Sequence, residues 1–466
     1  MTAPRFNHCE LAGVTGGRWI GAPPREAVGV GIDTRRFPAG ALFVALAGER
    51  FDGHDFVAAA AQAGAAAALV ADDRAAAMTA PPLPLLAVPD TLRALGALAR
   101  FHRLRFELPV VAVTGSNGKT TTREMIAAIL SRRGRTLKTD GNLNNEIGVP
   151  LTLFGLDEGH QAAVIEMGMS NPGEIARLAD IARPQIGVVT NAGAAHLEGL
   201  GTIDRVADAK AELYAGLPPT GVAIANADDP RMLKRAQASG RRVITFASGR
   251  QRRGDVVVLE ILEHAPEGLR FLLGVGNREL EVELPLVGAH NAANAAAATA
   301  AAVALGCTDR EIVAGLREVR PVGRRLRVER LASGVQLIDD CYNANPLSMG
   351  AALQTLADLV DDDEGTRPVA VLGDMLELGA FEAEAHRSVG DAAARSGVAL
   401  LAAFGPRSRA IAEAAAAAGL PADRIFHTED VDALIGWARG RLRPSDVLLV
   451  KASRGMQLER LVEALR

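Results

Sequence analysis

The sequence predicts an α/β protein of three domains: a small N-terminal α/β domain, a central domain with a mostly parallel sheet, and a C-terminal Rossmann-like domain. Two features of the 466 residues predict it. From residue 109 onward, near-continuous apolar runs alternate with amphipathic helical stretches, the pattern of parallel sheets covered by helices on both faces. The length also corresponds to about three domains at ~150 residues each.

The first domain is expected to span residues 1–89 and to consist of short strands separated by turns. Apolar strands are expected within VGVGIDTRR (28–36) and GALFVALAG (40–48). An alanine-rich helix is expected over 55–68, followed by the strand AALVA. The proline cluster PPLPLLAVP (81–89) then predicts a domain boundary.

The central domain, residues 90–320, begins with DTLRALGALARFHRLRF, whose apolar residues recur at helical spacing. More regularly alternating residues over 256–273 and in RELEVELPL predict an antiparallel addition to the sheet. The helix expected over 290–305 is almost entirely alanine, so a neighbouring element must approach it closely. The parallel strands are expected at 110–115, 162–168, 186–191, 221–226 and 242–246.

The third domain, residues 321–466, begins after Arg320-Pro321 with another series of apolar strands and helices. The charged stretch DDDEGTR (361–367) is expected to be a solvated loop before a strand. The strands are expected at 334–340, 368–374, 399–405 and 446–452.

Composition excludes several classes of protein. The net charge of −4 and a pI near 6.2 provide no basic field for nucleic acid or anionic membranes. The three cysteines lie far apart in sequence, which argues against a disulfide framework and against a CxxC metal site. The N-terminus lacks a signal pattern, and the apolar runs are shorter than the ~20 residues of a membrane helix. We expect a reduced, soluble, cytoplasmic protein.

The strongest local signal is VVAVTGSNGKTTT, an apolar strand that runs through a glycine-rich loop into a helix. Such loops cradle phosphates with backbone amides, and the lysine and the following threonine serve the phosphates and Mg²⁺. Valine stands at position 113, where the strict P-loop spacing has glycine, so the loop is a shortened variant; the alternative is a simple glycine turn. No Asn-Lys-x-Asp guanine-reading sequence occurs, which favours ATP. The residues expected to bind the nucleotide are Gly115, Ser116, Asn117, Gly118, Lys119, Thr120 and Thr121.

Three further side chains follow later strands and are candidates for metal binding and charge neutralisation: Glu166, His196 and Lys210. Taken singly, they could be a strand-end cap, a surface-loop residue and a solvated helix lysine. Their origin at one edge of the sheet, where open α/β sheets bind ligands, raises them above those alternatives. Only five of the 51 basic residues are lysine, so each lysine is a weak pointer to a need for a primary amine.

TGSNGKT, EMG, NAGAAHLEG, NADDP and the helix start HNAANAAAA together resemble the Mur ligases, the ATP-dependent amide-forming enzymes of peptidoglycan synthesis. LIDDCYNANP, VLGDMLELG and IDTRR…GALFVALAGERFDGHDF resemble the family member that joins D-alanyl-D-alanine to UDP-MurNAc-tripeptide. The resemblance covers essentially the whole chain.

The resemblance implies that ATP converts a substrate carboxylate to an acyl phosphate, which the amine of D-alanyl-D-alanine then attacks. The products would be UDP-MurNAc-pentapeptide, ADP and phosphate. It implies that Lys119 and Thr120 serve the phosphates and a first Mg²⁺, and that Glu166 and His196 hold magnesium ions. Lys210 would be carbamylated and would help to place a second Mg²⁺.

The resemblance also assigns nucleotide contacts. It gives Asn291 and Asn294 to the nucleotide, with a helix N-cap as the alternative for Asn291. Arg324 and Asp340 would reach the nucleotide when the third domain closes, and the choice between Arg324 and Arg325 stays open. Asn343 and Asn345 are expected near the substrate or the nucleotide.

Substrate contacts are expected in two further places. Asn144 and Asn145 in GNLNNEIGVP (141–150) match the loop that faces the muramoyl substrate. Lys451 and Arg454 in VKASRG could serve the substrate or domain closure, or could cap the sheet edge, and they stay outside the catalytic set. The residues that match the uridine-nucleotide region, and that could equally be turn residues, are Thr34, Arg35, Asp52, Gly53 and His54.

Two other functions stay open at this point. One is a different amide ligase of the superfamily, such as the tripeptide-forming Mur ligase or a folylpolyglutamate synthase, which carry another sequence in place of YNANP. The other is a non-catalytic, nucleotide-gated binding protein, which would not need a second metal site. We expect a monomer; the third residue of the stem tripeptide, diaminopimelate or lysine, does not follow from the sequence.

Overall fold

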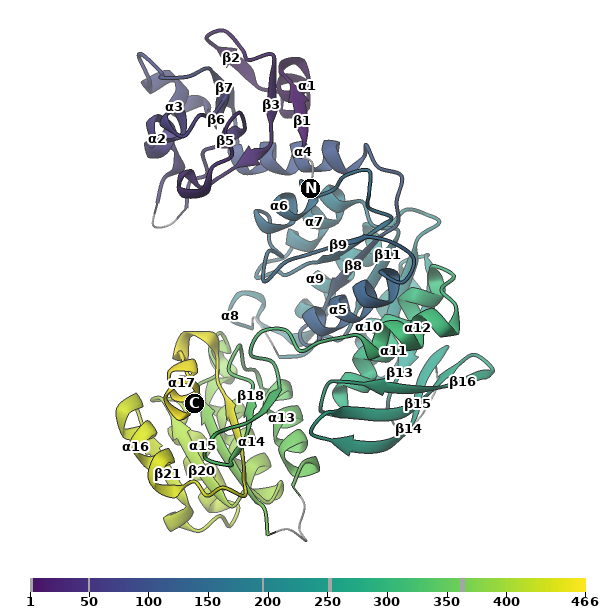
Figure 1. The fold of residues 1–466 in the computed structure, drawn as a ribbon, viewed down its shortest axis with the longest axis vertical. Coiled ribbons are helices and arrows are strands. Elements are labelled where there is room, and N and C mark those ends of the chain that lie inside the picture. The colour runs from purple at the N-terminus through teal and green to yellow at the C-terminus, as the bar shows by residue number, and fades with distance from the viewer. Residues whose placement is uncertain (1–2, 49–50, 195–196, 250–253, 361–364) are drawn as a thin grey trace.

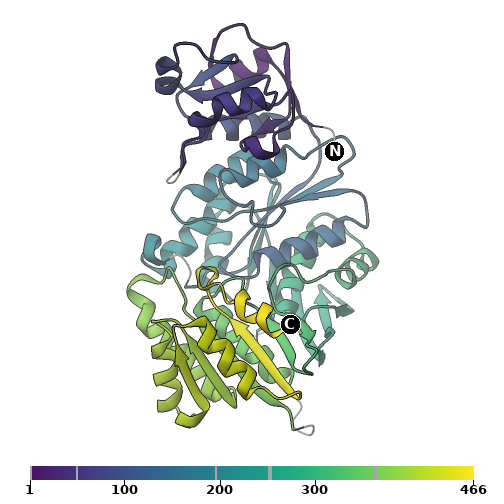
Figure 2. The ribbon, with the colours of Figure 1, turned by 60° about the vertical axis from the view of Figure 1, so that its left-hand side comes forward.

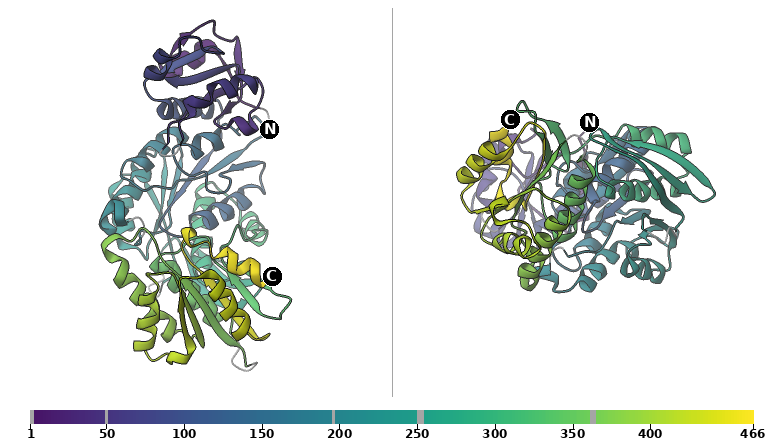
Figure 3. Two further views of the ribbon diagram at one scale, coloured as in Figure 1. Left: turned by 90° about the vertical axis from the view of Figure 1, so that its left-hand side faces the viewer. Right: turned by 90° about the horizontal axis from the view of Figure 1, so that it is seen from below.

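The computed structural model describes residues 3–48, 51–194, 197–249, 254–360 and 365–466. Three sheet-containing units follow one another along an elongated molecule, with the N-terminal unit at one end (Figures 1 and 2). Seen from below, the C-terminal unit lies beside the central one (Figure 3). The predicted three-domain α/β fold is confirmed.

The N-terminal unit contains a two-stranded and a five-stranded sheet. The predicted helix over 55–68 is wrong in its second half: α2 ends at Gln62, because Gly64 has φ +85° and breaks the helix before the next strand. The proline cluster contains strand β7 (Leu85–Val88), which lies between β2 and β6. The other elements are β1 (Arg5–Asn7), α1 (His8–Thr15), β2 (Arg18–Ile20), β3 (Glu26–Val28), β4 (Val30–Gly31), η1 (Thr34–Arg36), β5 (Leu42–Val44), η2 (Gly53–Phe56), α2 (Val57–Gln62), β6 (Ala67–Ala71) and α3 (Asp72–Ala77).

The central unit is built on a nine-stranded sheet of order β16-β15-β14-β13-β12-β11-β8-β10-β9. Strands β8 to β13 pair with one another in parallel. Strands β14, β15 and β16 pair antiparallel, as predicted. The strands are β8 (Val110–Thr114), β9 (Thr136–Lys138), β10 (Ala162–Glu166), β11 (Ile186–Val189), β12 (Val222–Asn226), β13 (Arg242–Ala247), β14 (Val256–Ala265), β15 (Gly268–Val275) and β16 (Arg278–Leu284).

Helices cover both faces of this sheet and enclose two separate apolar cores. Helix α11 is the predicted alanine helix, and nearly all of its residues are buried against α5 and the sheet. Alanine permits this close approach because its side chain ends at Cβ. The helices are α4 (Thr91–Arg103), α5 (Lys119–Leu130), α6 (Gly148–Leu153), α7 (Glu174–Ala182), α8 (Leu197–Leu200), α9 (Ile203–Ala215), α10 (Pro230–Ala238), α11 (His290–Ala304) and α12 (Asp309–Arg317).

The C-terminal unit has a six-stranded sheet of order β17-β18-β22-β19-β20-β21, parallel except at β17. The expected charged loop falls largely on residues 361–364, outside the described residues. No helix among the described parts of the chain has the length and apolar character to cross a membrane. The elements are β17 (Arg327–Arg330), β18 (Gln336–Asp339), α13 (Pro346–Asp358), β19 (Arg367–Gly373), α14 (Glu382–Arg395), β20 (Leu400–Phe404), α15 (Arg409–Ala417), β21 (Ile425–Thr428), α16 (Val431–Arg441), β22 (Asp446–Lys451) and α17 (Glu459–Leu465).

Candidate active site

The glycine-rich loop joins the end of β8 to the start of α5, where the carboxyl ends of the parallel strands meet. Gly118 is the N-cap of α5 and has φ +81°. A Cβ at Gly118 would collide with the side-chain amide of Asn294, and one at Gly115 with the hydroxyl of Thr190. Both glycines are therefore required by close packing around the loop.

Strand β11 leads into a segment that holds the loop from the side. The backbone N–H of Ser116 donates to Asn191 O over 3.0 Å, and that of Asn117 donates to Asn191 Oδ1 over 3.0 Å. The Ser116 hydroxyl contacts the backbone of Gly193 at 2.9 and 3.1 Å. These contacts fix the loop independently of any ligand.

Lys119 is the first residue of α5, and its ammonium folds over the loop. Nζ donates to Gly115 O over 2.7 Å. Desolvation lowers the pKa of Lys119 below its ordinary value; the Glu166 carboxylate opposes that shift and the Arg325 guanidinium adds to it. Arg325 belongs to the C-terminal unit, so a charge of that unit contributes to the electrostatics of this lysine.

Glu166, at the end of β10, is a buried carboxylate on which three donors converge. Thr120 Oγ1 donates to Oε2 over 2.9 Å and Arg123 to the same oxygen over 3.0 Å. Asn144 Nδ2 donates to Oε1 over 2.8 Å. The carboxylate thus connects the glycine-rich loop to the 141–150 loop, and Arg123 strengthens the connection by donating to Gly141 O over 3.2 Å.

The predicted metal-binding residues are placed unequally. The Thr120 hydroxyl and the Glu166 carboxylate are adjacent, and such hard oxygen donors fit Mg²⁺, which keeps several waters and takes few protein ligands. His196 lies outside the described residues. Across the described chain, no three His, Cys, Asp or Glu side chains converge as metal ligands do.

Lys210 lies on α9 and its side chain is buried, with 1 % of the residue exposed. Burial lowers the pKa of Lys210 well below its ordinary value, and the charge of Lys119 lowers it further. A lysine in such surroundings gives up its proton readily. This lysine is therefore not the solvated helix residue that its sequence context alone would allow.

Asn291 and Asn294 form a buried pair on α11. Asn294 Nδ2 donates to Asn291 Oδ1 over 2.9 Å, and Asn291 Nδ2 donates to Val287 O over 2.7 Å. Asn291 does not cap the helix, because the N-cap position belongs to Ala289. Asn294 touches the glycine-rich loop at Gly118, so α11 contributes directly to the wall of the candidate site.

The two asparagines of the 141–150 loop differ in their contacts. Asn144 points at Glu166, as described above. Asn145 Oδ1 instead accepts from the backbone N–H of Gly148 over 2.8 Å and from that of Ile147 over 3.2 Å. Its oxygen is therefore used at the start of α6.

The C-terminal unit presents two adjacent arginines in different ways. Arg324 donates to Asp339 Oδ2 over 3.0 Å and to Glu463 Oε1 over 2.7 Å. Arg325 lies with its guanidinium carbon 4.1 Å from the centre of the Tyr342 ring. Leu326, which follows, has φ +49°, a costly conformation for leucine. The two adjacent arginines therefore have different partners.

Asp340 and Asn343 lie in the connector between β18 and α13, which we define as residues 340–345. Asp340 Oδ1 accepts from the backbone N–H of Leu326 over 3.2 Å. Lys451 Nζ donates to Asp340 Oδ2 over 2.6 Å and to Asn343 O over 2.9 Å. Burial raises the pKa of Asp340, and the Lys451 ammonium opposes that rise. Lys451 thus anchors the connector.

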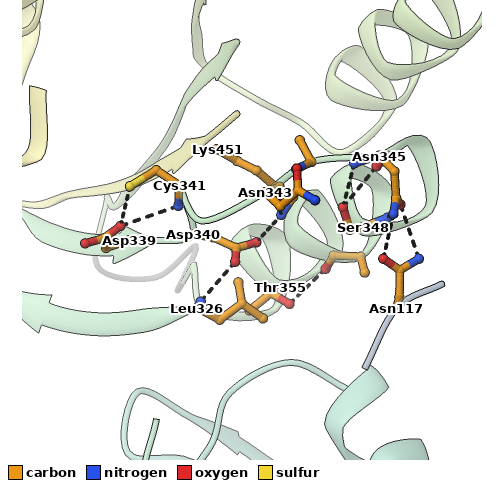
Figure 4. Close-up of polar contacts among 12 residues, drawn as sticks. Asn117, Leu326, Asp339, Asp340, Cys341, Asn343, Asn345, Ser348, Thr355 and Lys451 are labelled. Carbon is orange, nitrogen blue, oxygen red and sulfur yellow. Dashed lines mark hydrogen bonds and ion pairs between the residues drawn. The ribbon is translucent and has the colours of Figure 1, made fainter. Parts of the chain in front are cut away.

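Asn345 ends this connector and reaches the glycine-rich loop (Figure 4). Its Nδ2 donates to Asn117 Oδ1 over 2.7 Å, and Asn117 Nδ2 donates back to Asn345 Oδ1 over 3.2 Å. The C-terminal unit therefore touches the phosphate loop directly.

The predicted uridine-nucleotide residues lie in the N-terminal unit. Asp52 caps η2 by accepting from the backbone N–H of His54 over 3.0 Å and contacts His54 Nδ1 over 2.5 Å. His54 Nε2 accepts from Ala71 N over 2.9 Å. Gly53 packs against the backbone of Leu46. Thr34 and the exposed Arg35 lie in η1, with Arg35 paired to Asp33.

Sequence reasoning missed three residues of this site. Lys451 was set aside although it is one of only five lysines, and that scarcity was the available signal. Arg123 and Tyr342 carried no signal in the sequence, because an arginine on a helix and a tyrosine in a loop are ordinary. Only their contacts with Glu166 and Arg325 single them out.

Comparisons with known proteins identify the family of this chain. Residues 26–103 match the profile described as Mur ligase family, catalytic domain, residues 113–302 the Mur ligase middle domain, and residues 323–454 the Mur ligase, glutamate ligase domain. The UDP-N-acetylmuramoyl-tripeptide–D-alanyl-D-alanine ligase of Escherichia coli (strain K12) is 42% identical over 93% of this chain and 92% of its own. The ligase of the same name from Bacillus subtilis (strain 168) is 38% identical over 94% and 93%.

Solved structures agree as well. MurF from Acinetobacter baumannii superposes with a TM-score of 0.90 at 35% identity, covering 100% of this chain and 99% of its own. MurF from Thermotoga maritima, solved in complex with ADP, superposes with a TM-score of 0.82 at 28% identity over 94% and 96%. The chain therefore belongs to the Mur ligase family, and within it to the UDP-N-acetylmuramoyl-tripeptide–D-alanyl-D-alanine ligases.

Proposed function

We propose that this chain joins D-alanyl-D-alanine to UDP-MurNAc-tripeptide at the expense of ATP, giving UDP-MurNAc-pentapeptide, ADP and phosphate for peptidoglycan synthesis. One observation carries the proposal: Lys119 folds over the glycine-rich loop at the same sheet edge as the buried Thr120–Glu166 pair, and the C-terminal unit touches that loop through Asn345. The relatives of that name support the choice of substrates.

The chemistry explains these residues. A carboxylate is a poor electrophile, so the γ-phosphoryl group of ATP first moves to the carboxylate of the tripeptide and makes an acyl phosphate. The amine of D-alanyl-D-alanine then attacks the acyl carbon, and the tetrahedral intermediate expels phosphate. Negative charge accumulates on oxygens in both steps, and the cations Lys119 and Arg325 stabilise it.

Mg²⁺ bound here would supply a Lewis acid that neutralises phosphate oxygens. We assign Thr120 and Glu166 to hold it, on the basis of their adjacent oxygens, and His196 on the resemblance alone. We assign carbamylated Lys210 to a second ion. Carbamylation requires a neutral amine to capture CO₂, and the lowered pKa of Lys210 supplies one.

We assign the three units to three tasks. Residues 1–89 would hold the UDP end of the substrate with Thr34, Arg35, Asp52, Gly53 and His54. Residues 90–320 would bind ATP, and residues 321–466 would close over it. Asn144 and Asn145 would meet the muramoyl substrate, and Asn343 and Asn345 would lie near the reacting groups. The remaining nucleotide contacts would be Asn291, Asn294, Asp340 and, of the two arginines, Arg325.

ATP and a UDP-linked precursor are cytoplasmic compounds, so the proposal places the chain in the cytoplasm. We also propose that the chain acts as a monomer.

The test is phosphate release from ATP in the presence of UDP-MurNAc-tripeptide, with and without D-alanyl-D-alanine. We expect release that requires both substrates, and a pentapeptide product by mass spectrometry. Release with UDP-MurNAc-dipeptide and a diamino acid instead would identify a tripeptide-forming ligase. ATP binding without turnover on any of these substrates would favour the non-catalytic binding protein.

A further inference from the structure

The backbone of Asn117 is held entirely by its own unit, which leaves its side chain for another purpose. Its N–H donates to Asn191 Oδ1 over 3.0 Å. Its carbonyl accepts from Thr190 Oγ1 over 2.5 Å and from Asn191 Nδ2 over 3.2 Å. The side-chain amide projects away from these contacts, toward Asn345 of the C-terminal unit (Figure 4).

Asn345 is equally fixed within its own unit. It is the N-cap of α13: Oδ1 accepts from the backbone N–H of Ser348 over 2.9 Å, and its own N–H donates to Ser348 Oγ over 3.0 Å. Pro346 at the first helical position restricts Asn345 to extended backbone, and its φ of −149° agrees. The amide is therefore presented to Asn117 by two rigid elements, so little side-chain freedom is lost in pairing.

A second contact supports the same docking. Leu347, on the first turn of α13, reaches Gly193 so closely that a Cβ at that glycine would collide with its methyl group. Gly193 in turn contacts the Ser116 hydroxyl at 2.9 and 3.1 Å. The start of α13 thus contacts the phosphate loop and the segment that holds it.

The connector links the docking contact at Asn345 to Arg325. Its far end is bound to Asn117 through Asn345, and its near end holds Leu326 through Asp340. The Tyr342 ring, between the two ends, lies 4.1 Å from the Arg325 guanidinium. The position of Arg325 relative to Lys119 therefore depends on where the connector is anchored.

We propose that Asn345 is a positioning residue which, paired with Asn117, docks the C-terminal unit on the phosphate loop and sets the position of Arg325, which stacks on Tyr342 of the connector. The role rests on the proposed ligase function for its kinetic consequence, but not for the docking itself. The pair joins two residues 228 positions apart in sequence.

The decisive variant is Asn345→Ser. Serine caps a helix about as well as asparagine but is too short to reach Asn117, so α13 keeps its cap while the amide pair is lost. Asn117→Ser removes the pair from the other side. Ser348→Ala is the matched control. It removes the hydroxyl contacts of the cap and leaves both hydrogen bonds between Asn117 and Asn345 in place.

We expect each of the two asparagine variants to lower kcat about tenfold, the order expected for two lost hydrogen bonds, while KM for UDP-MurNAc-tripeptide changes by less than about twofold. The double variant should lose no more than either single variant, because one lost partner already abolishes the pair. Ser348→Ala should keep its kcat. An unchanged kcat in Asn345→Ser, multiplied losses in the double variant, or an equal loss in Ser348→Ala would each overturn the proposal.

A distance measurement separates this proposal from the ligase assignment. Fluorophores at Gln237→Cys on α10 and Glu413→Cys on α15, both exposed positions, report the separation of the two units in a Cys9→Ser background. Asn345→Ser should broaden the distance distribution, and Ser348→Ala should not. This result needs no substrate, so it holds even if phosphate release fails; an unchanged distribution in Asn345→Ser would refute the docking.

Discussion

The guanidinium of Arg325 lies over the ring of Tyr342, with 4.1 Å between its central carbon and the ring centre. This stacking holds the arginine against the connector, and its charge contributes to the lowered pKa of Lys119. The neighbouring Arg324 is held by Asp339 and Glu463 instead. The two adjacent arginines therefore have different expected roles.

Replacing Arg325 should damage catalysis far more than replacing Arg324. Loss of one cation that stabilises transition-state charge costs about 10²-fold in kcat, and we expect that loss for Arg325→Ala. Arg324→Ala should change kcat by less than about fivefold, since the two ion pairs that it loses, with Asp339 and Glu463, lie within its own unit. Phosphate-release kinetics measure both, and the reverse order would contradict this assignment.

Lys210→Ala should be nearly inactive and should regain part of its activity with formate or acetate. The reason is that a small carboxylate can occupy the space of the proposed carbamate and restore its negative charge. Lys234→Ala is the control, because Lys234 is an exposed lysine on the neighbouring helix α10. Full activity of Lys210→Ala without any added carboxylate would exclude the carbamate.

Breaking the buried Arg123–Glu166 ion pair should destabilise the fold. Both side chains are at most 3 % exposed, so Arg123→Met leaves an unpaired buried charge, which costs about 3 kcal/mol or more. Arg132→Met is the control, because its ion pair with Glu318 is exposed and should contribute less than about 1 kcal/mol. Urea unfolding measures the free energy of unfolding of both variants. Equal losses would show that the buried ion pair contributes no more to stability than the exposed one.

His290 should make the protein less stable at low pH. Burial, with a contribution from the Lys451 charge, lowers the pKa of His290 from 6.5 to about 4. Between these values the unfolded chain binds the proton more readily than the folded one, so the free energy of unfolding falls as pH decreases through that window. We expect a loss of about 1–2 kcal/mol between pH 7.5 and pH 5 that His290→Gln removes. The exposed His264→Gln should retain the pH dependence; if both variants retain it, His290 is not its source.

Local sequence patterns predicted much of this fold. The rest depends on features that such patterns do not encode. The strand, glycine loop and helix around Lys119 were predictable, because each leaves a local signature of apolar residues, glycine or periodicity. The end of α2 was not, because a run composed mostly of alanine carries little periodicity and only Gly64 marks the break. Strand β7 was hidden by the prolines around it.

The candidate site likewise combines features that the sequence predicted with features that only the structure shows. Sequence order placed Glu166 and Lys210 at one sheet edge, but it could not distinguish Arg324 from Arg325. That distinction depends on their partners, two carboxylates for Arg324 and a tyrosine further along the chain for Arg325. The pairing of Asn117 with Asn345 likewise leaves no trace in either local sequence.

Helix α11 imposes a limit on how this chain can change. Its buried alanines pack closely against α5 and the sheet, and overpacking costs about 1–3 kcal/mol. Substitutions at these positions therefore reduce stability, whereas substitutions on the exposed faces of β14–β16 have little effect on it. A compound bound against α11 beside Asn294 would contact residues that tolerate few substitutions. Mutations that confer resistance would therefore have to arise elsewhere in the protein.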